Sequence, residues 1–238
     1  TCWIEMIVSD MHLPFLRFQH FNRLVVVLLA MGFFVEMSFA QNIPATTPTQ
    51  TKKVLIVGDS LSAEYGLTRG TGWIEHMAQQ AQRESVAVQL INASISGDTT
   101  SGGVTRLPSL LKLHQPHVVI IELGGNDALR GLDMNLTQAN LLTMINASQA
   151  TGAKVMVIAM QVPPNYGANY LKQMSAAYEK VSKTTGATLN QQFLKGVADD
   201  PDPLKWFQAD RIHPNEKAQP LMMKNVWPQL KKMLQAKP

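Results

Sequence analysis

Five short apolar runs recur along the chain, at 54–57, 86–91, 118–121, 154–160 and 187–190. They are rich in Val and Ile and show little alternation with polar residues, which is typical of strands buried on both faces of a sheet. Longer segments with apolar residues at helical spacing lie between and after them. We expect helices over about a dozen residues from Trp73, over 104–114, 135–150 and 169–184, and from near Asn215 past Trp227.

The regular alternation of strands and helices predicts the fold class. Each crossover between successive strands is long enough to connect parallel neighbours. The sequence therefore predicts an α/β protein with three α/β/α layers, built on a doubly wound sheet of about five parallel strands.

The first forty residues differ from the rest. Basic residues precede an apolar run at 24–35, and the small-x-small sequence Ser38-Phe39-Ala40 follows it. This order is typical of a secretory signal peptide, and the run is short for a membrane span. An uncleaved anchor stays open as an alternative, because Glu36 lies close to the expected cleavage site.

These patterns divide the chain into three parts. We interpret 1–40 as upstream residues plus a cleaved leader that starts at Met11, 41–52 as a disordered Pro/Thr-rich lead-in, and 53–236 as a single domain. The chain has one cysteine, Cys2, so the mature domain has no disulfide. The formal net charge of +4 is scattered, which argues against a nucleic-acid groove and allows weak contact with an anionic membrane surface.

The first strand leads directly into a candidate nucleophile. Ser60 follows 54–57 and Gly58-Asp59, where open α/β sheets place their ligand sites. We expect a tight turn that opens a helix and offers backbone N–H groups to a developing negative charge. A simple helix N-cap is the alternative interpretation of Ser60, and this segment alone does not choose between them.

Three later segments offer matching chemistry. A loop of small residues contains Gly97, and the third strand ends in Gly-Gly before Asn126, whose amide can donate hydrogen bonds. The loop around Gly97 and the Asn126 position could also be ordinary turns. Asp210 precedes His213 by three residues, and a carboxylate so placed can hold an imidazole as a general base for a serine.

Two other types of site are not expected. The pair His114 and His117 has no third metal ligand beside it, so we expect no metal site. The first strand is followed by neither a dinucleotide-binding nor a P-loop glycine pattern, which excludes a nucleotide-binding protein. The segment around Ser60 also lacks the GxSxG pattern of the α/β-hydrolase fold.

Together these segments resemble the four blocks of the SGNH, or GDSL, hydrolase family. The blocks are Gly58-Asp59-Ser60-Leu61-Ser62, Gly97 in its loop, Gly124-Gly125-Asn126-Asp127, and Asp210-x-x-His213-Pro214. They occur in the family's order and spacing, and the likeness covers nearly all of 53–236. The phrases around them resemble the secreted bacterial branch of acyl-CoA thioesterase/lysophospholipase and arylesterase enzymes. The resemblance implies a flavodoxin-like SGNH hydrolase fold and export across the inner membrane to the periplasm of a Gram-negative bacterium.

The resemblance also implies a role for each matching residue. Ser60 would be the nucleophile, His213 the general base and Asp210 the residue that orients it. The oxyanion hole would comprise the N–H groups of Ser60 and Gly97 and the side-chain amide of Asn126. No metal or organic cofactor is implied, and we expect Asp59 and Asp127 to brace the turns.

The expected substrate is a small-molecule acyl ester or thioester bound by a monomer. We expect its acyl chain to lie between 128–133 and 163–170, against Leu129, Leu132, Val162 and Tyr166; alternatively, these residues merely cap the sheet. Two other functions stay open. One is a carbohydrate O-deacetylase with the same site, and the other is a binding module that kept the fold without its chemistry.

Overall fold

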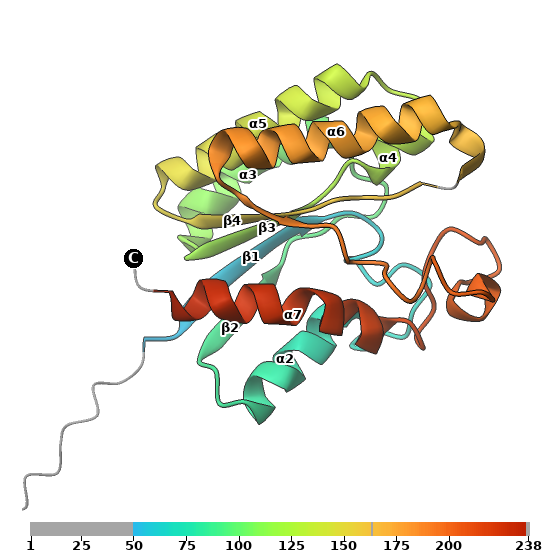
Figure 1. Cartoon of the computed structure of the whole chain (residues 1–238). Helices are drawn as coiled ribbons and strands as arrows, with labels where there is room; N and C mark the ends of the chain where they lie inside the picture. The colour runs from blue at the N-terminus through green and yellow to red at the C-terminus, as the bar shows by residue number, and fades with distance from the viewer. Residues whose placement is uncertain (1–49, 163, 237–238) are drawn as a thin grey trace, which may run out of the picture. The chain divides into compact units, whose positions relative to one another are not determined.

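A five-stranded parallel sheet forms the centre of the molecule (Figure 1). The computed structural model describes residues 50–162 and 164–236. The sheet order is β2-β1-β3-β4-β5, which confirms the predicted doubly wound arrangement. The strands are β1 (Lys52–Gly58), β2 (Val88–Asn92), β3 (Val118–Glu122), β4 (Lys154–Ile158) and β5 (Thr188–Asn190).

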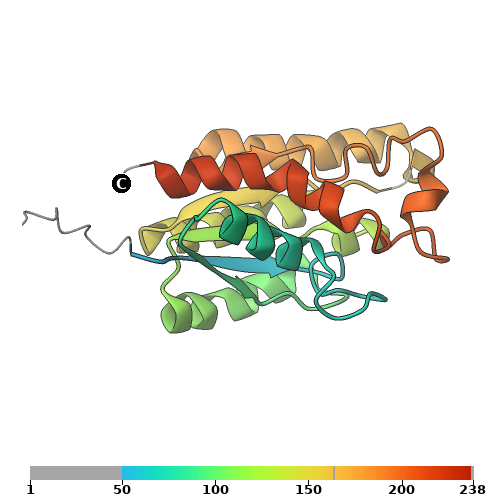
Figure 2. The same cartoon turned by 90° about the horizontal axis from the view of Figure 1, so that it is seen from below.

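Helices cover both faces of the sheet and complete three layers. One face carries α2 (Trp73–Arg83) and α7 (Gln219–Gln235), and the other carries α3 (Thr100–His114), α5 (Met134–Ala150) and α6 (Ala168–Thr185). Seen from below, α7 and α2 lie in front of the strands (Figure 2). The described residues also contain three short helices: α4 (Gly125–Leu129), η1 (Pro164–Tyr166) and η2 (Pro203–Trp206).

The two central strands are buried as their sequences predict. Val54–Val57 of β1 and Val118–Ile121 of β3 have at most 1% of their surface exposed. Trp73 of α2 and Met144 of α5 are also fully buried and belong to the same apolar core. The unbroken apolar runs therefore reflect contact with helices on both faces.

Strand boundaries differ from the expected ones by a few residues. β1 begins at Lys52, one residue before the predicted domain start, because the Lys52 N–H donates to the carbonyl of Ala87 across 3.1 Å. The second and fifth strands begin later than expected, at Val88 and Thr188. The fourth strand ends earlier, at Ile158.

Two helices start four residues away from the expected positions, and α5 and α6 start one residue earlier than expected. The helix expected over 104–114 begins at Thr100, whose backbone N–H donates to Asp127 across 2.9 Å. The last helix begins at Gln219 instead of near Asn215. Asn215 instead accepts a hydrogen bond from the N–H of Lys217 across 3.0 Å and so stabilises a separate turn.

The interpretation of Ser60 as a helix N-cap is wrong, and so is the helix expected after it. Residues 60–66 form successive turns. Asp59 acts as the local cap, because its Oδ1 accepts the N–H of Leu61 across 3.1 Å. The hydroxyl of Ser60 is therefore not needed to satisfy a helix end.

The strand order determines where a ligand site can form. The chain leaves β1 for β2 on one side and returns to β3 on the other. The carboxyl ends of β1 and β3 are therefore neighbours at a topological switch point, where open α/β sheets bind ligands. Ser60 follows β1 and Asn126 follows β3 at this position.

The leader and most of the lead-in, residues 1–49, lie outside the described residues. Within 50–162 and 164–236, none of the helices combines the length and apolar character that a membrane crossing requires.

Candidate active site

Ser60, His213 and Asp210 form a continuous line of hydrogen bonds. The Oγ atom of Ser60 lies 2.9 Å from Nε2 of His213. The Nδ1 atom of the same ring lies 2.7 Å from Oδ2 of Asp210. With a proton on Nδ1 facing the carboxylate, Nε2 is free to accept the proton of the serine hydroxyl. The tertiary structure thus brings together the three residues predicted to perform the catalysis.

A tight turn before α7 presents the acid and the base together. Phe207 pairs with Pro214 in an antiparallel bridge, and the Gln208 N–H donates to the carbonyl of His213 across 2.8 Å. Within this turn, Oδ1 of Asp210 accepts the backbone N–H groups of Ile212 and His213. The carboxylate therefore binds its own turn with one oxygen and the imidazole with the other.

The pKa of Asp210 lies below its ordinary value. Partial burial acts to raise it, but the N–H donors of His213 and Ile212 and the His213 ring outweigh that effect. Asp210 is consequently a carboxylate at neutral pH, as the orientation of an imidazole requires.

Tyr65 packs against His213. The two ring centroids are 4.4 Å apart with an interplanar angle of 40°. The carbonyl of Tyr65 accepts the side-chain amide of Gln208 across 2.8 Å, which ties the turn after β1 to the turn before His213. The sequence carries no signal for this contact, because the two segments are far apart in the chain.

Asn126 occupies the first turn of α4. The preceding Gly124 has a φ of 115°, which a residue with a side chain rarely adopts. A Cβ at Gly124 would also collide with the hydroxyl of Tyr178. The amide of Asn126 donates to Oδ2 of Asp59 across 3.1 Å and to the carbonyl of Asp98 across 2.9 Å. It therefore lies between the turn after β1, which contains Ser60, and the loop that contains Gly97.

Two arginines hold the loop that contains Gly97. The guanidinium of Arg130 donates to the Gly97 carbonyl across 2.8 Å. Arg106 of α3 forms an ion pair with Asp98 at 2.8 Å and donates to the carbonyl of Gly58 across 3.3 Å. Sequence reasoning missed both residues, because a single arginine shows no distinguishing pattern. The predicted oxyanion roles of Ser60, Gly97 and Asn126 stay predictions.

The two aspartates predicted to brace turns do so. Asp59 caps its own turn and accepts the amide of Asn126. Asp127 accepts the backbone N–H and hydroxyl of Thr100 and the hydroxyl of Thr137. Burial raises the pKa of Asp59 to about 6, although the Leu61 N–H, the Glu122 side chain and His213 oppose the rise.

A cavity of about 600 Å³ opens beside Ser60, Asn126 and His213. Of the four residues expected to bind the acyl chain, Leu129 and Val162 line this cavity. Leu132 and Tyr166 do not belong to its lining; the Tyr166 hydroxyl instead donates to the carbonyl of Leu129 across 3.3 Å.

Much of the remaining apolar lining comes from a segment that sequence reasoning did not assign to substrate. Its apolar members between β5 and the His213 turn are Leu194, Ala198, Pro203, Leu204, Phe207 and Ile212. The segment has no helical or strand periodicity, so its sequence indicates only an irregular connection.

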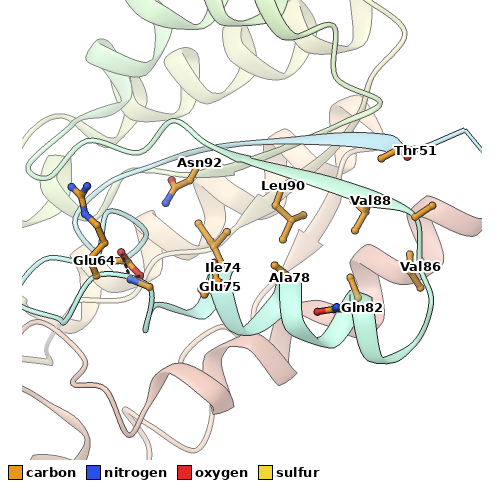
Figure 3. A pocket seen from close by; sticks show the side chains of 14 residues that line it. Thr51, Glu64, Ile74, Glu75, Ala78, Gln82, Val86, Val88, Leu90 and Asn92 are labelled. Carbon is orange, nitrogen blue, oxygen red and sulfur yellow. Dashed lines mark hydrogen bonds between the residues drawn. The ribbon is translucent and has the colours of Figure 1, made fainter.

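A second cavity of about 580 Å³ lies between α2 and β2 (Figure 3). Its middle is apolar, with Ile74 and Ala78 on α2 facing Leu90 and Val88 on β2. Neither a serine nor a histidine is among the described residues that line it. The cavity beside Ser60 is therefore the candidate site.

His117, one of the two histidines considered as a metal pair, has a structural role. Nδ1 of His117 accepts the backbone N–H of Lys53 across 3.0 Å. In the part of the chain that the structure describes, no group of three or more His, Cys, Asp or Glu residues is placed to hold a metal ion.

Comparison with known proteins gives consistent matches. A model of the GDSL-like Lipase/Acylhydrolase family matches residues 56–220. The chain is 42% identical over 189 residues to Esterase TesA of Pseudomonas aeruginosa, covering 79% of this chain and 92% of that protein. It is 40% identical over 169 residues to Thioesterase 1/protease 1/lysophospholipase L1 of Escherichia coli K12, covering 71% of this chain and 78% of that protein.

A solved structure is similar along the whole of its own length. The psychrotrophic esterase EstA from Pseudoalteromonas sp., crystallised with monoethylphosphonate as inhibitor, matches with a TM-score of 0.73 and 38% identity. The match covers 78% of this chain and 100% of that one.

Proposed function

We propose that this protein hydrolyses esters through an acyl-enzyme on Ser60. The premise is that the chain belongs to the GDSL-like lipase/acylhydrolase family and is an ester-hydrolysing serine hydrolase. One observation carries the proposal: the unbroken hydrogen-bond line from Ser60 through His213 to Asp210 at the wall of a cavity. This is the arrangement that activates a serine hydroxyl for attack on a carbonyl.

The reaction proceeds in two halves. Oγ of Ser60 bonds to the carbonyl carbon while Nε2 of His213 takes the hydroxyl proton. The tetrahedral oxyanion is stabilised by the N–H groups of Ser60 and Gly97 and the amide of Asn126. The carbon–oxygen or carbon–sulfur bond to the leaving group then breaks, and His213 returns the proton to that alcohol or thiol.

Water completes the cycle. His213 takes a proton from a water molecule, whose oxygen attacks the acyl carbon. Collapse of the second tetrahedral intermediate releases the carboxylic acid and returns the proton to Oγ of Ser60. Asp210 stabilises the imidazolium in both halves. No step requires a metal or an organic cofactor.

The acyl chain occupies the cavity beside Ser60. Leu129, Val162, Leu194 and Phe207 are among the apolar residues that line it. Its volume of about 600 Å³ falls within the range of small-molecule sites. We infer that acyl-CoA thioesters, lysophospholipids and simple or aryl esters are the substrate classes, and that the protein acts as a monomer.

Weak contact with a membrane surface belongs to the same proposal. Six exposed large apolar side chains lie outside the α-helices in the connections that follow the strands: Tyr65, Ile95, Leu132, Tyr166, Leu204 and Ile212. Exposed apolar side chains in these connections are compatible with substrates presented at a lipid surface. The basic and apolar order of residues 17–40 supports export to the periplasm.

The test combines covalent labelling with a substrate series. Purified protein is treated with a fluorophosphonate probe, the adduct is mapped by mass spectrometry, and hydrolysis of p-nitrophenyl esters from acetyl to palmitoyl is measured. We expect an adduct on Ser60 and turnover that disappears in Ser60→Ala. A folded protein without adduct or turnover would overturn the proposal in favour of a binding module.

The same series separates the second candidate function. Turnover of medium or long acyl chains, acyl-CoA and lysophospholipid is the expected result. Activity restricted to acetyl esters and acetylated polysaccharide would instead identify a carbohydrate O-deacetylase.

A further inference from the structure

A fully buried carboxyl group lies directly beneath the nucleophile turn. Glu122, the last residue of β3, has no exposed surface. Its Oε2 lies 3.1 Å from the backbone nitrogen of Asp59 and 2.6 Å from Oγ of Ser62. Its Oε1 is buried without a hydrogen-bond partner among the described residues. The chemistry proposed for Ser60 does not use this group.

The surroundings of Glu122 are shaped to hold it. A side chain at Gly58 would place its Cβ 2.5 Å from Oε2, so only glycine allows the carboxyl to approach β1. Ser62 accepts the indole N–H of Trp73 across 3.2 Å and donates its own hydroxyl to Glu122. The carboxyl is thus the end point of a buried polar chain that starts in α2.

Glu122 is connected to both proposed catalytic elements through Asp59. The backbone N–H of Asp59 donates to Glu122. The carboxylate of Asp59 accepts the N–H of Leu61, next to Ser60, and the amide of Asn126. A displacement of Asp59 would therefore move the nucleophile turn and the oxyanion donor together.

We propose that Glu122 is a positioning residue for ester hydrolysis: by binding Asp59 and Ser62, it fixes Ser60 and Asn126 relative to each other. The inference rests on the proposed roles of Ser60 and Asn126. Glu122 does not touch the substrate and acts only through its two neighbours.

The surroundings of the carboxyl favour its neutral form. Burial and the adjacent charge of Asp59 raise the pKa of Glu122 well above its ordinary value. Glutamine has nearly the shape of a neutral glutamic acid and keeps one carbonyl oxygen as an acceptor for the Asp59 N–H and the Ser62 hydroxyl. An apolar residue, in contrast, would leave the Asp59 N–H and the Ser62 hydroxyl without an acceptor. Glutamine at position 122 should therefore preserve the activity, whereas leucine should not.

The experiment compares Glu122→Gln and Glu122→Leu with the wild type in p-nitrophenyl ester hydrolysis. We expect Glu122→Leu to lower kcat by roughly 100-fold, comparable with the loss of one oxyanion donor, while KM stays within about threefold because the cavity is unchanged. Glu122→Gln should keep kcat within about fivefold of the wild type, since it preserves the acceptor. Fluorophosphonate labelling of Ser60 should slow in parallel with kcat.

Asn190→Leu is the matched control for lost stability. Asn190 is also a buried polar residue at the end of a strand, but its side chain binds Asn225 and Gln229 of α7. This variant should lower Tm and leave kcat unchanged below Tm. If Glu122→Leu behaves like Asn190→Leu, or if Glu122→Gln loses as much kcat as Glu122→Leu, the positioning role is overturned.

Ser62→Ala keeps the proposal testable if Glu122→Leu does not fold. It removes one of the two groups that bind Glu122, and we expect a smaller loss of kcat, roughly tenfold, with KM unchanged. Unaltered kcat in Ser62→Ala would then overturn the proposal. Absence of turnover and of Ser60 labelling in the wild type would instead contradict the proposed function itself.

Discussion

The amide nitrogen of Asn126 lies 3.1 Å from a carboxylate oxygen of Asp59 and 2.9 Å from the carbonyl oxygen of Asp98. Both of its N–H groups therefore have partners before any substrate arrives. These contacts hold the amide at the edge of the cavity beside Ser60. In the proposed mechanism, an oxyanion formed there would share one of these N–H groups with its present partner.

Removal of the Asn126 amide should slow the chemical step. We expect Asn126→Ala to lower kcat by roughly 10² to 10³, the effect of one lost oxyanion donor. Asn140→Ala is a suitable control, because the Asn140 amide donates to Thr100 instead of facing the site. Steady-state kinetics with a p-nitrophenyl ester measures the effect. Wild-type turnover in a folded Asn126→Ala variant would contradict the oxyanion assignment.

Removal of the proposed nucleophile should lower kcat more than removal of the orienting carboxylate. Ser60→Ala should reduce kcat on the order of 10⁶, whereas Asp210→Asn should cost roughly 10⁴ through the wrong imidazole tautomer. Asp200→Asn serves as the control, since Asp200 lies in the same segment but pairs with Lys205. Equal activity of Asp210→Asn and Asp200→Asn would exclude Asp210 from the triad.

The length of the accepted acyl chain should depend on the wall formed by 194–212. Ala198 is exposed and lines the cavity, so Ala198→Trp should fill space without disturbing the core. We expect the preferred p-nitrophenyl ester to become shorter by several carbons. Leu132→Glu tests the groove between 128–133 and 163–170. If only Leu132→Glu shortens the preferred chain, that groove binds the acyl group and the 194–212 wall does not.

The buried Asp59 should make stability depend on pH. Its pKa is raised to about 6 in the folded state, so between about pH 4 and 6 the folded protein keeps a proton that the unfolded chain releases. The stability that this group contributes is present below pH 4 and is lost as pH rises through 6.

Asp59→Asn removes this dependence. The variant should therefore gain stability relative to the wild type as pH rises. The difference in free energy of unfolding, variant minus wild type, should be larger at pH 7.5 than at pH 4 by about 2 kcal/mol. Urea unfolding at both pH values measures it. A constant offset between variant and wild type at the two pH values would show that Asp59 titrates normally.

The central sheet could be predicted because its signal is local and strong. Strands β1 and β3 are apolar on both faces, and their runs at 54–57 and 118–121 differ clearly from the flanking loops. Boundaries were less accurate where a distant partner decides them. The N–H of Thr100, the first residue of α3, donates to Asp127, and no pattern near Thr100 indicates that contact; the side chain of the neighbouring Thr99 caps the helix by accepting the N–H of Gly102.

The first segment alone left the role of Ser60 open between a nucleophile and a helix N-cap for a related reason. Asp59 and Ser60 are adjacent, and both residue types cap helices well. The choice between the two roles of Ser60 depends on His213, which contacts the Ser60 hydroxyl from 153 positions away in the chain.

The sequence by itself determined the strand–helix alternation and the pairing of Asp210 with His213, because both depend on residues close together in the chain. Only the tertiary structure decided which hydroxyl His213 engages, where Glu122 is buried, and that residues 194–212 form a cavity wall. Each of these depends on segments brought together by the strand order. The physical reason is that packing across the sheet, unlike helical or strand periodicity, leaves no regular pattern in the residues it joins.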